Sequence, residues 1–372
     1  MTTKKIILPT FLTYTLGCRV NQAEASAISN QLTACGFQFF TPDLQLSRSP
    51  ALVIINTCAV TQKAERESRK AIHHYKRVYP QAKIIALGCA AKFVKDADLI
   101  IENPQKSNAI KIILKKFSFA PRRCQAKYLT PNPYHLSDRA LVKIQEGCDQ
   151  FCHYCIVPYL RGKPKSTKQE EIICQINKLV EEGIKEIILC GINLSLYGID
   201  LTPPISLITL IKKILSQTKA ERISLSSIEP EYLYENREFA ELFIKEPRLS
   251  KYFHLALQSG SSETIKVMGR KTDLTKLMKT IHFIKEKCPK FTFRADIIVG
   301  FPTETEKNFQ ETLDFIKKVP ITFCHVFRYS VRPGTLAAKK IKTKEWTETP
   351  PAIKKERAKK VADLVKKINA EK

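Results

Sequence analysis

Short apolar runs alternate with stretches of helical spacing through the first third of the chain. The runs that predict buried strands are residues 11–16, 51–56 and 83–87. Between them, residues 21–35 and 63–78 place apolar side chains three and four positions apart, which predicts helices. Strand–helix–strand alternation indicates a parallel sheet with right-handed crossovers. We therefore expect residues 1–125 to form a flavodoxin-like α/β domain.

Each of the predicted strands is followed by a cysteine. Cys18, Cys58 and Cys89 end the segments TYTLGC, VIINTC and IIALGC. The carboxyl ends of parallel strands meet at one edge of a sheet, so strand polarity alone brings these thiols together. The alternative is that they are ordinary half-buried cysteines. The matching positions favour a shared site.

A second alternation of strands and helices follows a proline-rich stretch over residues 121–133, which predicts a linker at residues 126–137. The predicted strands are 141–146, 186–189, 222–226, 252–257, 291–299 and 321–327. The predicted helices between them include 168–182, 274–287 and 306–319. Six βα units suit a partial (β/α)6 barrel over residues 138–338, whose active site belongs at the carboxyl ends of the strands.

The remaining residues, 339–372, form a basic tail. Val361, Leu364, Val365 and Ile368 follow the spacing of one helix face. This pattern predicts an amphipathic helix. Its basic face is explained equally well by solvation around a packed stripe and by contact with nucleic acid.

The charge of the chain points to a polyanionic partner. The 372 residues include 62 Lys and Arg against 36 Asp and Glu, a formal charge of +26. Nucleic acid is the commonest partner of so basic a protein, and an anionic membrane surface is second. No apolar run reaches the ~18 residues that a membrane span needs. The 12 cysteines are too sparse for a small disulfide scaffold and favour metal or cluster chemistry.

The sharpest chemical signal is GCDQFCHYCIVPYLRG, which directly follows the first strand of the second unit. Cys148, Cys152 and Cys155 have the spacing C-x3-C-x2-C. Three thiolates on one loop can hold three corners of an iron–sulfur cubane and leave one iron open. A structural zinc site is the alternative, but it wants four ligands, and His153 would compete with its neighbours for the metal.

These residues, and several segments beyond them, resemble the radical S-adenosylmethionine (SAM) methylthiotransferases. The resemblance is carried by VKIQEGCDQFCHYCIVPYLRG, HLALQSGS, ADIIVGFPTETEKNF and HVFRYSVRPGT, and it covers nearly the whole chain. The triad Cys18, Cys58 and Cys89 is similar to that family's auxiliary-cluster domain. LGCRVNQAE and NTCAVTQKAERESRKAI are similar to the enzymes that act on N6-threonylcarbamoyladenosine beside the tRNA anticodon, at position 37.

The resemblance implies two [4Fe–4S] clusters and SAM. It implies that Cys148, Cys152 and Cys155 hold the cluster that cleaves SAM to a radical, which takes hydrogen from C2 of the modified adenine. It implies that the other triad holds the sulfur source and that a second SAM supplies the methyl group. The partners it implies are tRNA and an electron donor. We expect a monomeric, cytoplasmic protein with no membrane partner.

Further site residues are carried over from the resemblance and from their positions at or near strand ends. The predicted SAM contacts are Gly191, Asn193, Ser227, Glu229, Gln258 and Asp296. The predicted phosphate contacts are Arg161, Lys163, Lys165, Arg328 and Arg332. For the first set the alternative is loop capping or core hydrogen bonding, and for the second it is a solvated surface.

The chain also departs from the family pattern. It stops at Lys372, where family members continue into a small β-barrel RNA-binding domain, so we expect that domain to be missing: either tRNA binding relies on the basic surface alone or the sequence is truncated. Thr303 and Thr272 replace a glycine and a tyrosine that are usual in the family. These departures bear on substrate affinity more than on catalysis. Three alternatives stay open: the same chemistry on isopentenyladenosine, the same chemistry on a ribosomal protein, and a non-catalytic iron–sulfur RNA-binding protein.

Overall fold

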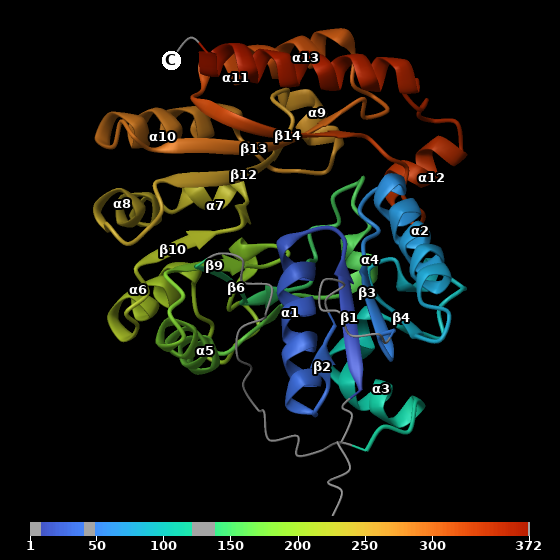
Figure 1. Cartoon of the computed structure of the whole chain (residues 1–372). Coiled ribbons are helices and arrows are strands. Elements are labelled where there is room, and N and C mark those ends of the chain that lie inside the picture. The colour runs from blue at the N-terminus through green and yellow to red at the C-terminus, as the bar shows by residue number, and fades with distance from the viewer. Residues whose placement is uncertain (1–8, 41–48, 121–137, 371–372) are drawn as a thin grey trace, which may run out of the picture. The chain divides into compact units, whose positions relative to one another are not determined.

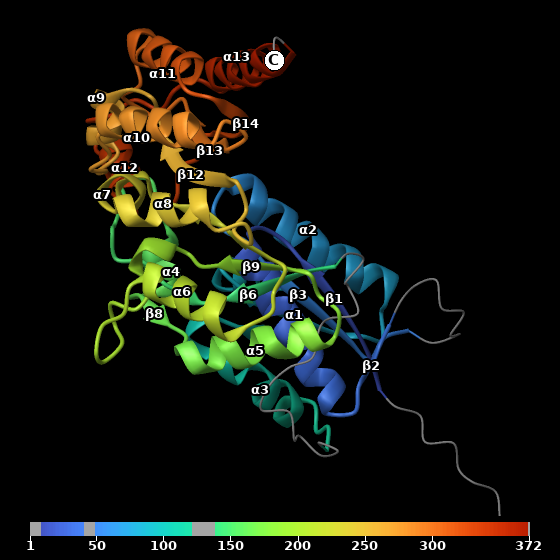
Figure 2. The ribbon, with the colours of Figure 1, turned by 90° about the vertical axis from the view of Figure 1, so that its left-hand side faces the viewer.

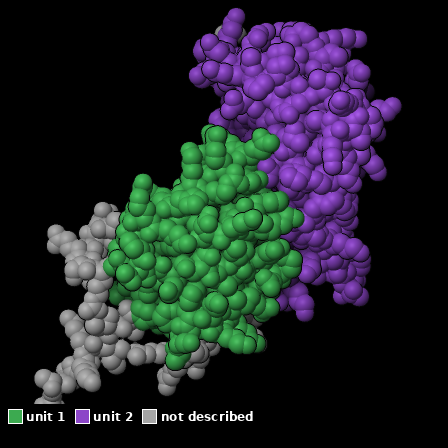
Figure 3. Space-filling model, turned by 90° about the vertical axis from the view of Figure 1, so that its right-hand side faces the viewer, with its two compact units in different colours: residues 1–143, 174–184 green, residues 144–173, 185–372 purple. Residues whose placement is uncertain are grey.

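The computed structural model of the chain describes residues 9–40, 49–120 and 138–370. These residues fall into two compact units, coloured green and purple in Figure 3. The first unit is Met1–Lys143 with Cys174–Ile184, and the second is Ile144–Ile173 with Lys185–Lys372. The predicted linker lies outside the described residues.

The first unit is built on a parallel sheet. Its strands follow the order β2 (Gln38–Phe39), β1 (Thr10–Thr15), β3 (Leu52–Thr57), β4 (Lys83–Gly88) and β5 (Leu99–Ile101). Its helices are α1 (Arg19–Ala34), α2 (Gln62–Val78) and α3 (Ala109–Lys116), with 3₁₀ turns at η1 (Ala91–Phe93) and η2 (Asn103–Asn108). This strand order is that of flavodoxin-like folds, which confirms the predicted class.

Both faces of this sheet are covered by helices, because its central strands are apolar on both sides. On β3, Leu52 and Ile54 join the core formed with α1 and α3. Val53 and Ile55 point the other way and join the core formed with α2. Alternation along one strand thus fills two cores, as expected for a parallel sheet buried on both faces. The helices can be followed in Figure 1.

The second unit carries two sets of parallel strands. β9 (Glu186–Cys190) pairs with β10 (Arg222–Leu225), and a second sheet has the order β11 (Ser227–Ile228), β12 (Tyr252–Gln258), β13 (Thr292–Val299) and β14 (Ile321–Arg328). β7 (Gln145–Glu146) pairs antiparallel with β8 (Lys165–Ser166). The strand that precedes β7, β6 (Arg139–Lys143), belongs to the first unit. Each long predicted strand is present within two residues of its expected start.

Helices lie between these strands and after the last of them. They are α4 (Val157–Arg161), α5 (Gln169–Glu181), α6 (Leu207–Gln217), α7 (Pro230–Glu235), α8 (Arg237–Lys245), α9 (Ser262–Val267), α10 (Leu274–Lys287), α11 (Glu306–Lys318), α12 (Leu336–Lys342) and α13 (Pro351–Ala370), with the 3₁₀ turn η3 at Leu194–Leu196. The alternation of strands and helices confirms the predicted α/β class. It places the strand ends, and the residues that follow them, at the edge where barrels of this kind hold ligands.

A cluster of phenyl rings joins α8 to the second sheet. Phe239 and Phe243 of α8 contact Phe253 of β12, which in turn contacts Phe291 and Phe293 around the start of β13. Phe253 and Phe293 are register partners across the two strands. Because side chains alternate along a strand, the residues next to these rings point to the opposite face of the sheet.

The C-terminal helix α13 packs within the second unit. It lies along β14 and α11, as Figure 2 shows. Val361 and Val365 are buried, which confirms the packed stripe of the predicted amphipathic helix. Arg357 of α13 donates Nη1 to Glu304 Oε2 at 2.7 Å, and the same carboxylate accepts the Gly300 N–H at 2.6 Å. Burial raises the pKa of Glu304, and the Gly300 N–H and Arg357 oppose that rise.

Replacing Arg357 by alanine should destabilise the second unit. The change leaves the buried Glu304 carboxylate without its guanidinium, and breaking a buried pair in this way costs about 3–5 kcal/mol. Lys359→Ala, on an exposed position of the same helix, is the matched control and should cost less than about 0.5 kcal/mol. Urea unfolding followed by circular dichroism measures both. Equal unfolding midpoints for the two variants would contradict the structural role of the pair.

No helix among residues 9–40, 49–120 and 138–370 is long and apolar enough to cross a membrane.

Candidate active site

The first unit places its three predicted cysteines at one edge of the sheet. Cys18 follows β1, Cys58 follows β3 and Cys89 follows β4. These strands are neighbours and parallel, so their carboxyl ends lie side by side. The order of the strands reverses between β1 and β3, and ligands of open α/β sheets bind at such a switch point. Cys58 and Cys89 are buried, whereas Cys18 is exposed.

The loops that carry these thiols approach each other closely. Gly17 has a φ of +92°, and a Cβ added to it would lie 2.7 Å from Cys58 Sγ. A side chain at this position would therefore collide with the second cysteine. The Asn103 Nδ2 group lies 3.5 Å from Cys89 Sγ and donates to it. The backbone before Cys18 and the sulfur of Cys58 thus share one small space.

A buried asparagine ties two of these loops together. Asn21 Nδ2 donates to the carbonyl of Leu16 at 2.8 Å and to that of Thr57 at 2.9 Å. In turn, Asn56 Nδ2 donates a hydrogen bond to the backbone carbonyl of Asn21 at 2.6 Å. The backbone N–H of Cys89 donates to the carbonyl of Thr57 at 3.1 Å. Sequence reasoning did not assign this role. The available signal was the position of Asn21 within the RVNQAE segment, three residues after the first cysteine.

A buried charge cluster lies next to this network. Glu24 pairs with Lys106 and, at 3.1 Å, with Lys143, and Lys106 Nζ also donates to Asn56 Oδ1 at 3.0 Å. These contacts hold two ammonium groups near the end of β3.

The second unit presents its cysteines on the loop between β7 and α4. Cys152 is buried, and Cys148 and Cys155 are half-buried. Burial raises the pKa of each thiol, that of Cys155 to about 12. Donors from two other elements oppose this: Asn193 Nδ2 lies 3.9 Å from Cys148 Sγ and Arg270 Nη1 lies 3.8 Å from Cys152 Sγ. Three sulfur donors on one loop, two of them facing N–H groups, fit the thiolate ligands of an iron–sulfur cluster.

Arg270 joins this loop to a predicted SAM residue. Its Nη2 forms a buried ion pair with Glu229 and donates to the Ala256 carbonyl at 2.9 Å, and its Nη1 lies 3.5 Å from the Tyr154 hydroxyl. Burial raises the pKa of Glu229, while the adjacent guanidinium lowers it. The carboxylate is therefore held beside the cysteine loop by a fixed cation. Sequence reasoning did not single out Arg270.

The other predicted SAM residues lie at successive strands. Gly191 and Asn193 follow β9, and the Asn193 N–H donates to Gln145 Oε1 at 2.9 Å. A Cβ at Gly191 would lie 2.9 Å from the Leu194 side chain. Ser227 begins β11, Gln258 ends β12 with a φ of 70°, and Asp296 lies within β13. The structure thus links Asn193 and Glu229 to the cysteine loop; SAM contact by all six residues stays a prediction.

Two predicted phosphate contacts are wrong. The Arg161 side chain is 0% exposed and pairs with Glu146 at 2.8 Å, and Arg332 is 2% exposed. Sequence shows the charge of an arginine but not its burial, and a guanidinium is readily buried when it is paired. The other three residues, Lys163, Lys165 and Arg328, are exposed, and phosphate contact by them stays a prediction.

Comparison with known proteins identifies the family. A model described as "Radical SAM superfamily" matches residues 142–316, and one described as "Uncharacterized protein family UPF0004" matches residues 10–110. The threonylcarbamoyladenosine tRNA methylthiotransferase MtaB of Aquifex aeolicus is 34% identical over 373 residues, which cover 96% of this chain and 88% of that protein. The chain belongs to the radical SAM methylthiotransferases.

Other members and solved structures extend this result. The tRNA-2-methylthio-N(6)-dimethylallyladenosine synthase of Clostridium botulinum is 32% identical over 393 residues, which cover 100% of this chain and 85% of that protein. The radical SAM methyltransferase TsrM of Kitasatospora setae has a TM-score of 0.63 at 12% identity, over 92% of this chain and 77% of that one, and shows a shared fold. This methylthiotransferase is therefore an enzyme that uses SAM and a [4Fe–4S] cluster.

If the C-x3-C-x2-C loop of the second unit holds the cluster, assembly of that cluster should depend on pH. Iron binds thiolates, and the raised pKa of Cys155, about 12, keeps that thiol protonated near neutrality. Raising the pH should therefore increase the thiolate fraction by about tenfold per unit below the pKa, so assembly should be faster at about pH 8.5 than at about pH 7. Anaerobic reconstitution followed by visible absorbance measures this, with a Cys148→Ala/Cys152→Ala/Cys155→Ala variant as baseline. If the difference in assembly rate between wild type and the triple variant is the same at both pH values, the prediction is wrong.

Proposed function

We propose that this enzyme converts N6-threonylcarbamoyladenosine at position 37 of tRNA into its 2-methylthio derivative. The observation that carries the proposal is the presence of one strand-end cysteine triad in each of the two units. Methylthio transfer needs a radical to activate carbon and a separate sulfur donor, so two sites of this kind suit it. The substrate is supported by the relatives named as threonylcarbamoyladenosine enzymes.

The proposed cluster ligands divide between the units. Cys148, Cys152 and Cys155 would hold the cluster of the radical SAM domain, and Cys18, Cys58 and Cys89 would hold a second [4Fe–4S] cluster. When bound, the first cluster supplies the electron that cleaves SAM and the second supplies sulfur. Three protein ligands leave one iron of each cluster open for SAM or for sulfur.

Residues around the loop would position the reactants. Arg270 holds the Glu229 carboxylate beside Cys152, where it can bind the amino group or the ribose of SAM. Asn193 reaches the same loop from the end of β9. Gly191 would let the backbone approach the SAM carboxylate.

The partners follow from charge and chemistry. A formal charge of +26 supports binding to the tRNA backbone, and the exposed Lys163, Lys165 and Arg328 are the proposed phosphate contacts near the site. Such contacts position the RNA, whereas the base pocket specifies it. An external electron donor must reduce the cluster. We propose a monomer that works in the cytoplasm.

Expression in a bacterium deleted for its own tRNA methylthiotransferases tests the substrate. Total tRNA is digested and its nucleosides are weighed. We expect 2-methylthio-N6-threonylcarbamoyladenosine in cells that carry the chain and none in cells that carry the Cys148→Ala variant. If 2-methylthio-isopentenyladenosine alone appears, the proposed substrate is wrong, whereas the proposed reaction, methylthio transfer to tRNA, stands. Absence of both products, with the protein expressed and its clusters assembled, would overturn the tRNA assignment.

A further inference from the structure

Helix α2 of the first unit buries only a narrow face. Of its 17 residues, Ser68, Ala71 and Ile72 are buried. Ala71 and Ile72 pack in the core on one face of the parallel sheet, and the helix can be followed in light blue in Figure 1. Most of the other side chains of α2 are exposed, so the core does not dictate their chemistry.

The face of α2 opposite its buried residues carries a basic row. The exposed residues of this row are Lys63, Arg66, Lys70, His74 and Arg77. They recur every three or four positions, which places them on one side of the helix. At a rise of about 1.5 Å per residue, the row is about 21 Å long.

Positive charge is in excess along this helix. α2 contains six Lys and Arg against two Glu. Glu67 lies 4.0 Å from Arg66 and 3.6 Å from Lys70, in exposed ion pairs that contribute little and that a polyanion can replace. Asp96 reaches α2 from another element and lies 3.4 Å from His73, which is outside the row. These acids leave the basic row with a net positive charge.

The helix macrodipole does not account for the whole row. Arg77 lies in the last turn of α2, where the dipole favours a cation. Lys63 lies in the first turn, where the dipole disfavours one. The row therefore extends into a turn where a cation does not stabilise the helix, which points to a role outside α2 itself.

The basic row begins beside the cysteine triad of the first unit. Cys58 lies four residues before α2, and its backbone N–H donates to Ser68 Oγ at 3.1 Å. Thr61 caps the helix by accepting the Ala64 N–H at 3.1 Å. A ligand that follows the row is therefore led towards the cysteines that we propose as the sulfur-donor site.

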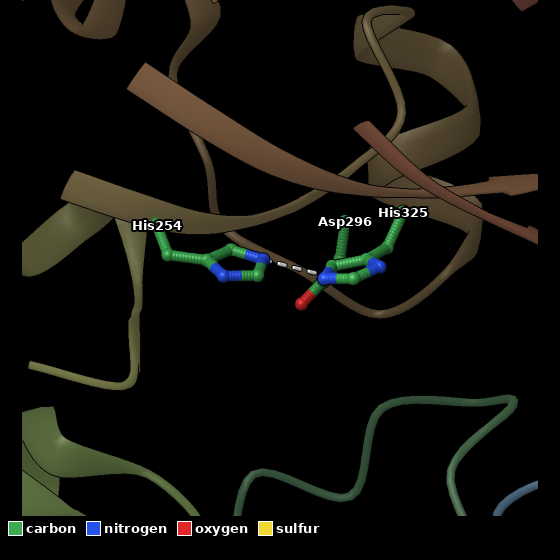
Figure 4. A group of neighbouring side chains, drawn as sticks. All are labelled: His254, Asp296 and His325. Atoms are coloured by element: carbon green, nitrogen blue, oxygen red, sulfur yellow. Dashed lines mark hydrogen bonds and ion pairs between the residues drawn. The ribbon is translucent and has the colours of Figure 1, made fainter. Parts of the chain in front are cut away.

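The titratable cluster on the second sheet lacks such an excess of positive charge. Figure 4 shows His254, Asp296 and His325 in one row, with His254 Nε2 2.9 Å from Asp296 Oδ1. One ligand atom of each residue lies within 4.8 Å of the others. A carboxylate stands among the two imidazoles, so a polyanion gains less here than on α2.

We infer that the basic row of α2 binds the phosphate backbone of the substrate RNA beside the first-unit cysteines. This inference rests on the proposed function and adds a docking surface to it. An RNA strand repeats its phosphates in a line, so it can meet several exposed cations of one helix face at once. Because phosphate contacts carry no base information, the row strengthens binding without selecting the nucleoside.

The test measures binding of two labelled anticodon stem-loops to the full chain by fluorescence anisotropy at several salt concentrations. One RNA carries threonylcarbamoyladenosine and the other carries unmodified adenosine. The variant is Lys63→Gln/Lys70→Gln/Arg77→Gln, which keeps good helix formers and removes three charges from one face. We expect its Kd at about 0.1 M salt to rise by about tenfold or more, by the same factor for both RNAs. The slope of log Kd against log salt should fall by about 2 to 3, and by about 0.7 to 0.9 for Lys70→Gln alone.

The matched control is Lys111→Gln/Lys115→Gln/Lys116→Gln. It removes the same charge from exposed positions of α3, which packs in the core on the other face of the same sheet. Its Kd should stay within about twofold of wild type. Circular dichroism checks that both triple variants fold.

The outcomes separate the inference from the proposed function. Wild-type affinity and salt slope in the α2 variant, or an equal loss in the α3 variant, would overturn the inference, and the proposed function stands if wild type makes the methylthio nucleoside. A loss confined to the modified RNA, or to anionic phosphatidylserine vesicles, would also overturn it. If wild type makes no methylthio product while only the α2 variant loses RNA affinity, the docking surface stands and the proposed function is wrong.

Discussion

Replacing Cys152 by alanine should abolish reductive cleavage of SAM. Cys152 is the buried member of the second-unit triad and lies 3.8 Å from the Arg270 guanidinium. We propose that the three thiolates of this loop hold the cluster together, so the loss of one should lower the rate of 5′-deoxyadenosine release by at least about a thousandfold. The release is measured by chromatography under anaerobic, reducing conditions.

The matched control is Cys174→Ala, which removes a half-buried thiol from α5. This variant should cleave SAM at the wild-type rate, because Cys174 belongs to neither triad. Wild-type release of 5′-deoxyadenosine by Cys152→Ala would show that the radical chemistry does not depend on the C-x3-C-x2-C loop.

Replacing Cys58 by alanine should separate SAM cleavage from methylthio transfer. Cys58 belongs to the first unit, and its sulfur lies where a Cβ on Gly17 would touch it. The variant should lose about four of the about eight irons expected for two [4Fe–4S] clusters. It should still release 5′-deoxyadenosine within about twofold of wild type and make methylthio product at less than about 1% of the wild-type rate.

Iron content, SAM cleavage and nucleoside product are measured on one preparation of Cys58→Ala. Asn103→Ala provides a graded comparison, because Asn103 donates to Cys89 but is not itself a proposed cluster ligand. It should retain the second cluster and lose about 10–100-fold in product formation, as changes around metal ligands do. Full methylthio transfer by Cys58→Ala would remove the first-unit triad from the mechanism.

Sequence patterns predicted the scaffold because each local signal was strong. Continuous apolar runs marked the buried parallel strands, and Cys18, Cys58 and Cys89 each followed one of them. Strand polarity was then enough to bring them to one edge. The short strands β2 and β5 went unpredicted, since two or three residues carry no usable period.

The contacts around the sites depend on features that no local pattern encodes. His254, Asp296 and His325 come together because β12, β13 and β14 pair side by side, with Asp296 opposite His325 and His254 opposite Arg294. The segments that supply these residues are far apart in the chain. Arg270 reaches the cysteine loop from the turn after α9. Arg332 is as basic in sequence as Arg328, yet the fold buries one and exposes the other. Long-range packing decides these roles.

The most direct test is one anaerobic reaction of the reconstituted full chain. The mixture contains SAM with a deuterated methyl group, a reductant and tRNA that carries N6-threonylcarbamoyladenosine but no methylthio group. The tRNA is digested and its nucleosides are weighed. We predict a mass increase on threonylcarbamoyladenosine equal to one methylthio group that contains the deuterated methyl. SAM cleavage without any such increase, on tRNA shown to bind the protein, would contradict the proposal.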